Sequence, residues 1–162
     1  RLRHHNSHQE QVMNIRRAVP EDTDIIYELG KSVTEFAVTD NTVTFWPKTV
    51  LDHAVRSDDM VMLVAEDDVV TGFLIAQYND GLRKGVIENV YVRPDKRGQG
   101  MDDLLLKRAL EILREKGCEF VSTQVPSGVQ DAVRLYEQNG FRRGEELFIW
   151  LDRSLADSYA KS

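Results

Sequence analysis

The most constraining feature of the sequence is a run in which a β-rich segment, a basic glycine-containing loop and an amphipathic helix follow directly on one another. Residues 86–92 read VIENVYV, and the loop over residues 93–100 ends in RGQG. Apolar residues at helical spacing then predict a helix over residues 101–116. A helical crossover of this kind joins parallel strands, so we expect the next strand, residues 120–125, to lie parallel to the first.

The loop has the composition of an anion-binding site. Gly98 and Gly100 allow backbone N–H groups to converge, and the first N–H groups of the helix add partial positive charge. Lys96 and Arg97 add full charges at the same place. The pattern predicts a pocket for a ligand that carries phosphate. An ordinary strand-to-helix turn is the alternative, because the motif lacks the G-K-[ST] ending of a P-loop and the third glycine of G-x-G-x-x-G.

Two motifs in the same order carry a resemblance to a known family. Residues 90–100, VYVRPDKRGQG, resemble the acetyl-CoA-binding segment of the GNAT-type N-acetyltransferases. Residues 132–141, AVRLYEQNGF, are similar to the second signature of that superfamily, A-x-x-L-Y-x-x-x-G-F. The resemblance covers residues 14–152. It implies a mixed α/β sheet with the GNAT-like acyl-CoA acyltransferase fold in a single domain, acetyl-CoA as the cofactor, and acetyl transfer to a primary amine.

The resemblance places the cofactor along the strand and the loop. The residues expected to bind it are Val90, Tyr91, Val92, Arg97, Gly98, Gln99, Gly100, Met101 and Asp102. By this resemblance, the backbone of Val90 and Val92 would hold the pantetheine arm, and a backbone N–H there would polarise the thioester carbonyl. The N–H groups of the loop and the Arg97 guanidinium would face the pyrophosphate.

Two residues depart from the family pattern. Asp102 stands where a small residue is usual, and its carboxylate would repel a pyrophosphate unless it turns away or meets Lys96. Val129 stands where an asparagine is common. These departures keep a second hypothesis open, in which the chain is a CoA-binding sensor or interaction module without turnover.

Glu88 is the candidate general base. An alkylammonium has a pKa of about 10.4, so an amine is mostly protonated at neutral pH and must lose a proton before it attacks. Glu88 interrupts an apolar strand two residues before Val90, which predicts that both side chains share a face. A carboxylate in such a strand must meet a partner or line a cleft. The alternatives are a salt bridge, for instance with Arg83 or Lys84, and an edge position in water.

The resemblance supplies the second catalytic candidate and leaves the acceptor open. Tyr136 occupies the position whose family counterpart often protonates the departing thiolate; the alternative is that it only packs beside Phe141. The substrate pocket is expected to contain the aromatic side chains Phe36, Phe45, Trp46 and Tyr78. Their alternative role is in the core, and this applies to Phe45 most of all.

Periodicity predicts the remaining elements and the extent of the domain. Further strands are expected over residues 14–18, 60–65, 69–78, 84–92 and 145–151, and further helices from Pro20 onward and over residues 47–55 and 129–138. Residues 1–12 are expected to be a flexible leader or a remnant foreign to the domain, residues 13–152 the GNAT-like domain, and residues 153–162 a frayed tail.

The composition of the chain limits the classes of partner and the environment that we expect for it. The chain has 162 residues and a formal charge of −6, which argues against a nucleic-acid binder and suits a cationic small molecule. No apolar stretch reaches the ~20 residues of a membrane span. The single cysteine, Cys118, excludes an internal disulfide and favours a cytoplasmic location. No metal site is expected from the histidines of the first residues. Dimers are common among similar proteins, so a homodimer is one expected assembly.

Overall fold

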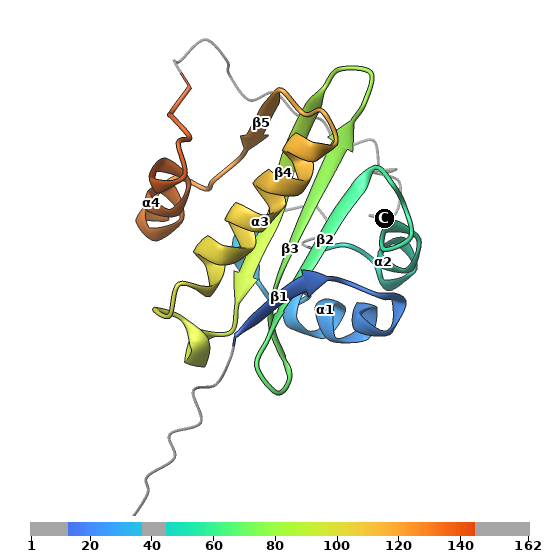
Figure 1. The fold of residues 1–162 in the computed structure, drawn as a ribbon. Coiled ribbons are helices and arrows are strands. Elements are labelled where there is room, and N and C mark those ends of the chain that lie inside the picture. Colours follow the sequence, from blue (N-terminus) through green and yellow to red (C-terminus); the bar gives the residue numbers. More distant parts are fainter. Residues whose placement is uncertain (1–12, 37–44, 145–162) are drawn as a thin grey trace, which may run out of the picture.

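The computed structural model describes residues 13–36 and 45–144 and shows one central sheet with helices on both faces (Figure 1). The strands follow one another across the sheet in chain order: β1 (Asn14–Arg17), β2 (Met60–Glu66), β3 (Val70–Asn79), β4 (Lys84–Val92) and β5 (Phe120–Thr123). Neighbouring strands are antiparallel except β4 and β5, which are parallel as predicted.

The helices form two layers around this sheet. One face is covered by α1 (Thr23–Gly30) and α2 (Lys48–Ala54), and the other by α3 (Met101–Glu115), which is the crossover from β4 to β5. Helix α4 (Gln130–Gln138) follows β5. Short 3-10 turns lie at η1 (Pro20–Asp22), η2 (Thr34–Phe36) and η3 (Pro94–Lys96). None of the helices in the described ranges is long and apolar enough to span a membrane.

Each face of the sheet has its own hydrophobic core. Residues 61–65 of β2 are all buried, because alternate side chains pack against α3 on one face and against α1 and α2 on the other. The nearly continuous apolar runs over residues 60–65 and 69–78 are typical of strands buried on both faces, and the structure agrees. Gly30 ends α1 directly against the Phe45 ring, where a Cβ atom would overlap the ring. This contact fixes the start of the segment that leads into α2.

A β-bulge interrupts β4 at Glu88. Ile75 of β3 pairs with Asn89, whereas the next residue, Ala76, pairs with Ile87, so Glu88 is an extra residue without a partner in β3. Ile87 and Val90 both pack in the core beneath α3. The expectation that Glu88 and Val90 share a face assumed that side chains alternate strictly along β4. A bulge breaks this alternation, so the assumption is wrong at Glu88.

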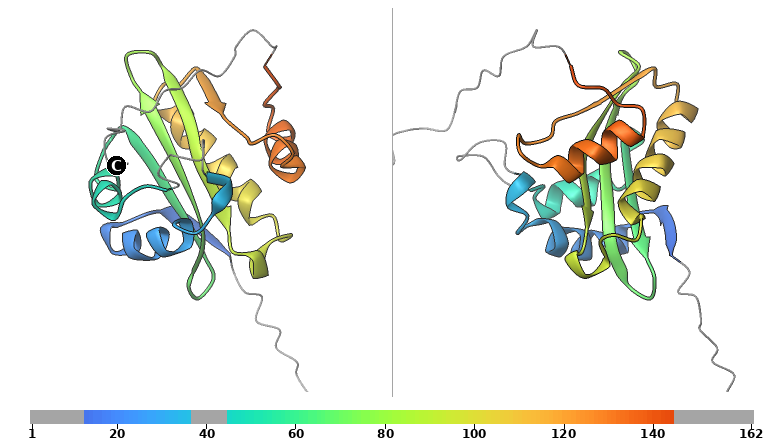
Figure 2. Two further views of the ribbon diagram at one scale, coloured as in Figure 1. Left: turned by 180° about the vertical axis from the view of Figure 1, so that it is seen from behind. Right: turned by 90° about the vertical axis from the view of Figure 1, so that its left-hand side faces the viewer.

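The bulge coincides with the end of the pairing between β4 and β5. The last paired residues are Ile87 and Thr123, yet β4 continues to Val92. The two strands separate beyond this point, and α4 lies in front of the exposed edge of β4 in the right-hand view of Figure 2. The expected strand over residues 145–151, the leader over residues 1–12 and the tail over residues 153–162 lie outside the described residues.

Candidate active site

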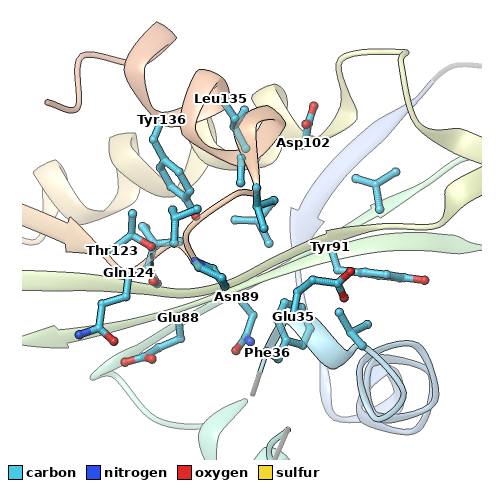
Figure 3. A pocket seen from close by; sticks show the side chains of 18 of the residues that line it. Glu35, Phe36, Glu88, Asn89, Tyr91, Asp102, Thr123, Gln124, Leu135 and Tyr136 are labelled. Atoms are coloured by element: carbon cyan, nitrogen blue, oxygen red, sulfur yellow. Dashed lines mark hydrogen bonds between the residues drawn. The ribbon is translucent and has the colours of Figure 1, made fainter. Parts of the chain in front are cut away.

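A cleft of about 1650 Å³ opens where β4 and β5 separate (Figure 3). Of the residues predicted for the site, those that line it are Phe36, Phe45, Trp46, Glu88, Val90, Tyr91, Val92, Arg97, Gly98, Met101, Asp102 and Tyr136. Gln99 and Gly100 lie next to it in the loop before α3. The cleft therefore joins the predicted cofactor segment to the predicted acceptor residues, and the bulge residue Glu88 lies on it.

The upper part of β4 presents unpaired backbone groups to the cleft. The N–H of Arg93 donates to the carbonyl of Thr71 on β3, with an N···O distance of 2.8 Å. Because hydrogen-bonded positions alternate in an antiparallel ladder, Tyr91 also faces β3, and Val90 and Val92 direct their backbone groups to the open edge. The Val92 carbonyl accepts a hydrogen bond from Arg97, so the groups left for a ligand are those of Val90 and the N–H of Val92. An extended ligand arm with amide groups could pair with this edge as a strand would.

The loop before α3 has the geometry of an anion cradle. Gly98 and Gly100 have φ angles of 81° and 77°, a region that glycine adopts readily. A Cβ atom on either residue would meet no other atom within 4 Å, so both glycines border open space. Gly100 is the N-cap of α3, whose first N–H groups carry positive partial charge. These features fit a diphosphate.

Lys96 and Arg97, the two cations nearest the glycines of the loop, are held by other groups. The Lys96 ammonium lies 2.8 Å from a carboxylate oxygen of Asp67, in the turn between β2 and β3. This hydrogen bond, together with backbone N–H groups, lowers the pKa of Asp67 to about 2. Arg97 donates from Nε to the carbonyl of Val92 at 3.0 Å, and its guanidinium lies over the Tyr91 ring. Lys96 and Arg97 thus brace the loop against the sheet.

Asp102 does not meet Lys96. Its carboxylate accepts a hydrogen bond from the N–H of Asp103 at 2.8 Å, which stabilises the first turn of α3. Asp103 in turn accepts a hydrogen bond from the Asn139 amide at 2.8 Å, which ties α3 to the end of α4. Although its carboxylate binds this N–H, Asp102 still lines the cleft.

Glu88 carries a carboxylate without an ion pair among the described residues. Arg83, one of its expected partners, binds Glu119 instead, with an N···O distance of 2.8 Å. Surrounding protein atoms remove part of the water around Glu88 and raise the pKa of its carboxyl group. The side chain is nevertheless exposed to the cleft. A carboxylate that contacts a cleft and whose pKa is raised is a candidate proton acceptor.

Tyr136 is buried on α4 and lines the cleft from the side opposite to β4. Burial raises the pKa of its phenol, and a hydrogen bond with Thr123 opposes this effect. Its ring also meets Phe141 edge-on, with centroids 5.1 Å apart, so the packing role and the position in the cleft occur together. Val129, just before α4, adds an apolar wall.

Aromatic side chains line the end of the cleft where the acceptor is expected. Trp46 donates from its indole nitrogen to the side-chain oxygen of buried Asn89 at 2.7 Å. Phe36 stacks on Phe45, with centroids 5.7 Å apart. Phe45 is buried in the core, which was its alternative role in the sequence-based prediction. Asn89 was not among the residues predicted for the site, although a polar residue next to Glu88 in an otherwise apolar strand was an available signal.

Tyr78 does not belong to this group of aromatic residues. It pairs with Gly85 at the other end of β4 and lies in the core beneath α3. Its hydroxyl donates to the carbonyl of Lys116 at 3.0 Å. The prediction that Tyr78 contributes to the acceptor pocket is thus corrected, because its position in β3 directs it to the opposite face and the far end of the sheet.

A mixed sheet splits beside a glycine loop at a helix N-terminus, an arrangement that fits an acyl-CoA ligand. Residues 26–141 match the sequence profile of the acetyltransferase (GNAT) family, and the chain belongs to this family. Acetyl-CoA is accordingly its cofactor.

Individual relatives are consistent with this assignment. An L-methionine sulfoximine/L-methionine sulfone acetyltransferase of Pseudomonas aeruginosa is 30% identical over 132 residues, which cover 69% of this chain and 77% of the relative. The L-amino acid N-acyltransferase MnaT of Escherichia coli is 31% identical over 104 residues, covering 57% and 59%.

Solved structures share the fold. AAC(6')-Iy, in complex with the bisubstrate analogue CoA-S-monomethyl-acetylneamine, superposes with a TM-score of 0.69 at 18% identity, and the match covers 88% of this chain and 99% of that one. The PaiA N-acetyltransferase of Thermoplasma acidophilum, in complex with coenzyme A, superposes with a TM-score of 0.69 at 21% identity, covering 81% and 90%.

Proposed function

We propose that the protein is an N-acetyltransferase that moves the acetyl group of acetyl-CoA to a primary amine by direct attack. The observation that carries the proposal is the bulge in β4, where the strand edge becomes free and Glu88 reaches the cleft opposite Tyr136. The names of the relatives support the reaction class, because amino acids and their analogues offer an amine to be acylated.

The proposed roles follow from these positions. The glycine loop, Gly98 to Gly100, holds the diphosphate, and the backbone of Val90 and Val92 holds the arm of the cofactor. Bound acetyl-CoA supplies an activated acyl thioester. Glu88 accepts the proton that the ammonium must lose, and Tyr136 donates its phenolic proton to the departing sulfur. Because burial raises the pKa of Tyr136, the phenol stays protonated until that step.

A thiol-release assay tests the function. Protein, acetyl-CoA and an amine are expected to liberate free thiol, whereas omission of the protein or the amine is expected to leave only slow hydrolysis. The amine panel contains polyamines, aminoglycosides, amino acids and peptides with free N-termini. Calorimetry with CoA measures binding separately. CoA binding without thiol release for any amine would favour the sensor hypothesis, for which Asp102 at the cleft is the supporting observation.

Replacement of Tyr136 by phenylalanine is expected to lower kcat about tenfold and to leave KM for the amine unchanged. A thiol has a pKa of about 8.5, so a thiolate is a fairly stable leaving group. Proton donation to the departing sulfur therefore contributes less to the rate than proton removal from the attacking amine. Tyr27→Phe, on α1 and outside the cleft, is the matched control. Full turnover of Tyr136→Phe would mean that Tyr136 only packs against Phe141.

A further inference from the structure

The charged side chains that line the cleft are unevenly distributed. Lys96 and Arg97 are the cations among the described lining residues, and both lie in the loop before α3, the predicted phosphate loop (residues 93–100). Both cations lie near the glycine loop together with Asp102, and Asp131 on α4 forms an ion pair with Arg134. Glu35 and Glu88 are carboxylates at the acceptor end, and both are exposed. Within residues 13–36 and 45–144 neither of them forms an ion pair.

The wall between the two carboxylates is aromatic and polar but uncharged. Figure 3 shows the carboxylates of Glu35 and Glu88 on opposite sides of Asn89 and Phe36. The Trp46–Asn89 hydrogen bond holds the indole against this wall. Aromatic rings attract cations through their faces and also accommodate methylene groups. An aliphatic chain with a positive nitrogen at each end would complement the two carboxylates and the aromatic wall.

A carboxylate on the acceptor would find no free cation at this end of the cleft among the described lining residues. Lys96 is held by Asp67, and Arg97 is held by the Val92 carbonyl and the Tyr91 ring. Both lie at the end of the cleft where the cofactor's phosphates are expected. An acceptor carboxylate beside the attacking amine would therefore lie near Glu88 without a compensating cation, which costs free energy because like charges repel.

We propose that the acceptor is a primary amine with a second cationic nitrogen on an aliphatic chain, and that a neighbouring carboxylate is selected against. Glu35 binds the distal cation, and Glu88 receives the proton from the attacking nitrogen. This inference rests on the proposed function, since it names the substrate class of the same cleft.

The experiment compares acceptors that share a five-carbon chain. They are pentylamine, 1,5-diaminopentane, lysine and lysinamide, which differ in the second ammonium group or in the carboxylate. The value of kcat/KM is expected to be at least fivefold higher for 1,5-diaminopentane than for pentylamine or lysine. Lysinamide, which lacks the negative charge, is expected to recover most of the loss. Added salt is expected to lower the preference for the diamine, because ions screen the attraction.

Variants test whether Glu35 causes the preference. Glu35→Gln is expected to raise KM for 1,5-diaminopentane several-fold and to leave KM for pentylamine unchanged. Glu28→Gln is the control, because Glu28 binds Lys31 on the surface of α1, outside the cleft. The inference would be overturned if kcat/KM for pentylamine or for lysine equalled that for 1,5-diaminopentane. It would also be overturned if Glu35→Gln kept the wild-type preference for the diamine.

A binding measurement separates this inference from the proposed function. Absence of thiol release with every amine would contradict the proposed function alone. Calorimetry of 1,5-diaminopentane with the CoA-loaded protein is then still expected to show binding that weakens in Glu35→Gln. If the wild-type protein binds pentylamine as tightly as the diamine, the cleft does not select a second cation.

Discussion

Glu88→Gln is expected to lower kcat/KM for amine acetylation about a hundredfold, the lower part of the range that general acid–base catalysis supplies. The pKa of Glu88 is raised because protein atoms displace water around its carboxyl group. The wild-type rate should therefore rise with pH as this carboxyl group loses its proton, at a pH above the ordinary glutamate range. Glutamine does not titrate, so this acidic limb should be absent from the pH–rate profile of the variant.

Measurements of kcat/KM between about pH 5 and 9 test the expectation, and calorimetry is expected to show unchanged CoA affinity. Glu115→Gln, in the exposed last turn of α3, is the control and should retain the wild-type profile. An acidic limb that persists in Glu88→Gln would remove Glu88 from the mechanism. Since Glu88 forms no ion pair with another described residue, a simple loss of folding is not expected from the substitution.

Replacing both Gly98 and Gly100 by alanine is expected to weaken CoA binding at least tenfold. Both residues have positive φ angles, and an L-residue other than glycine pays roughly 1–2 kcal/mol to adopt this conformation. The binding loop would therefore be less populated in its anion-binding shape, and the factor follows from about 1.4 kcal/mol per tenfold change in affinity. Calorimetry with CoA measures the effect directly.

Gly140→Ala is the matched control for backbone strain. Gly140 has a φ angle of 84°, and its Cβ position is as open as those in the loop, but it follows α4 outside the phosphate cradle. It is expected to lose a similar amount of thermal stability per site and to keep its CoA affinity. Equal CoA affinity in the loop variant and the wild-type protein would show that these glycines do not form the diphosphate site.

Local patterns account for the parts of the site that the sequence predicted. Nearly continuous apolar runs identified the buried strands, and the apolar stripe of α3 together with its preceding glycines identified the crossover and its loop. Positive φ angles at Gly98 and Gly100 agree with the reason for which glycine was invoked. Each of these features depends on residues close in sequence, whose spacing reports directly on backbone conformation.

The parts that the sequence analysis missed depend on register and on distant partners. The bulge at Glu88 arises from the pairing of β3 with β4, and it invalidates the alternation used to place Glu88 beside Val90. Lys96 was expected at the pyrophosphate or Asp102 but binds Asp67, in the turn between β2 and β3. Neither contact has a signature in the local sequence.

For this protein, the amino-acid sequence alone determined the order of strands and helices, the phosphate loop and the family motifs. Tertiary structure alone decided which aromatic residues meet the cleft: Trp46 reaches Asn89, whereas Tyr78 lies in the core under α3. The physical reason is that helix and strand periodicity acts over a few residues. The composition of a cleft is set by strand register, a bulge and the point where two strands part.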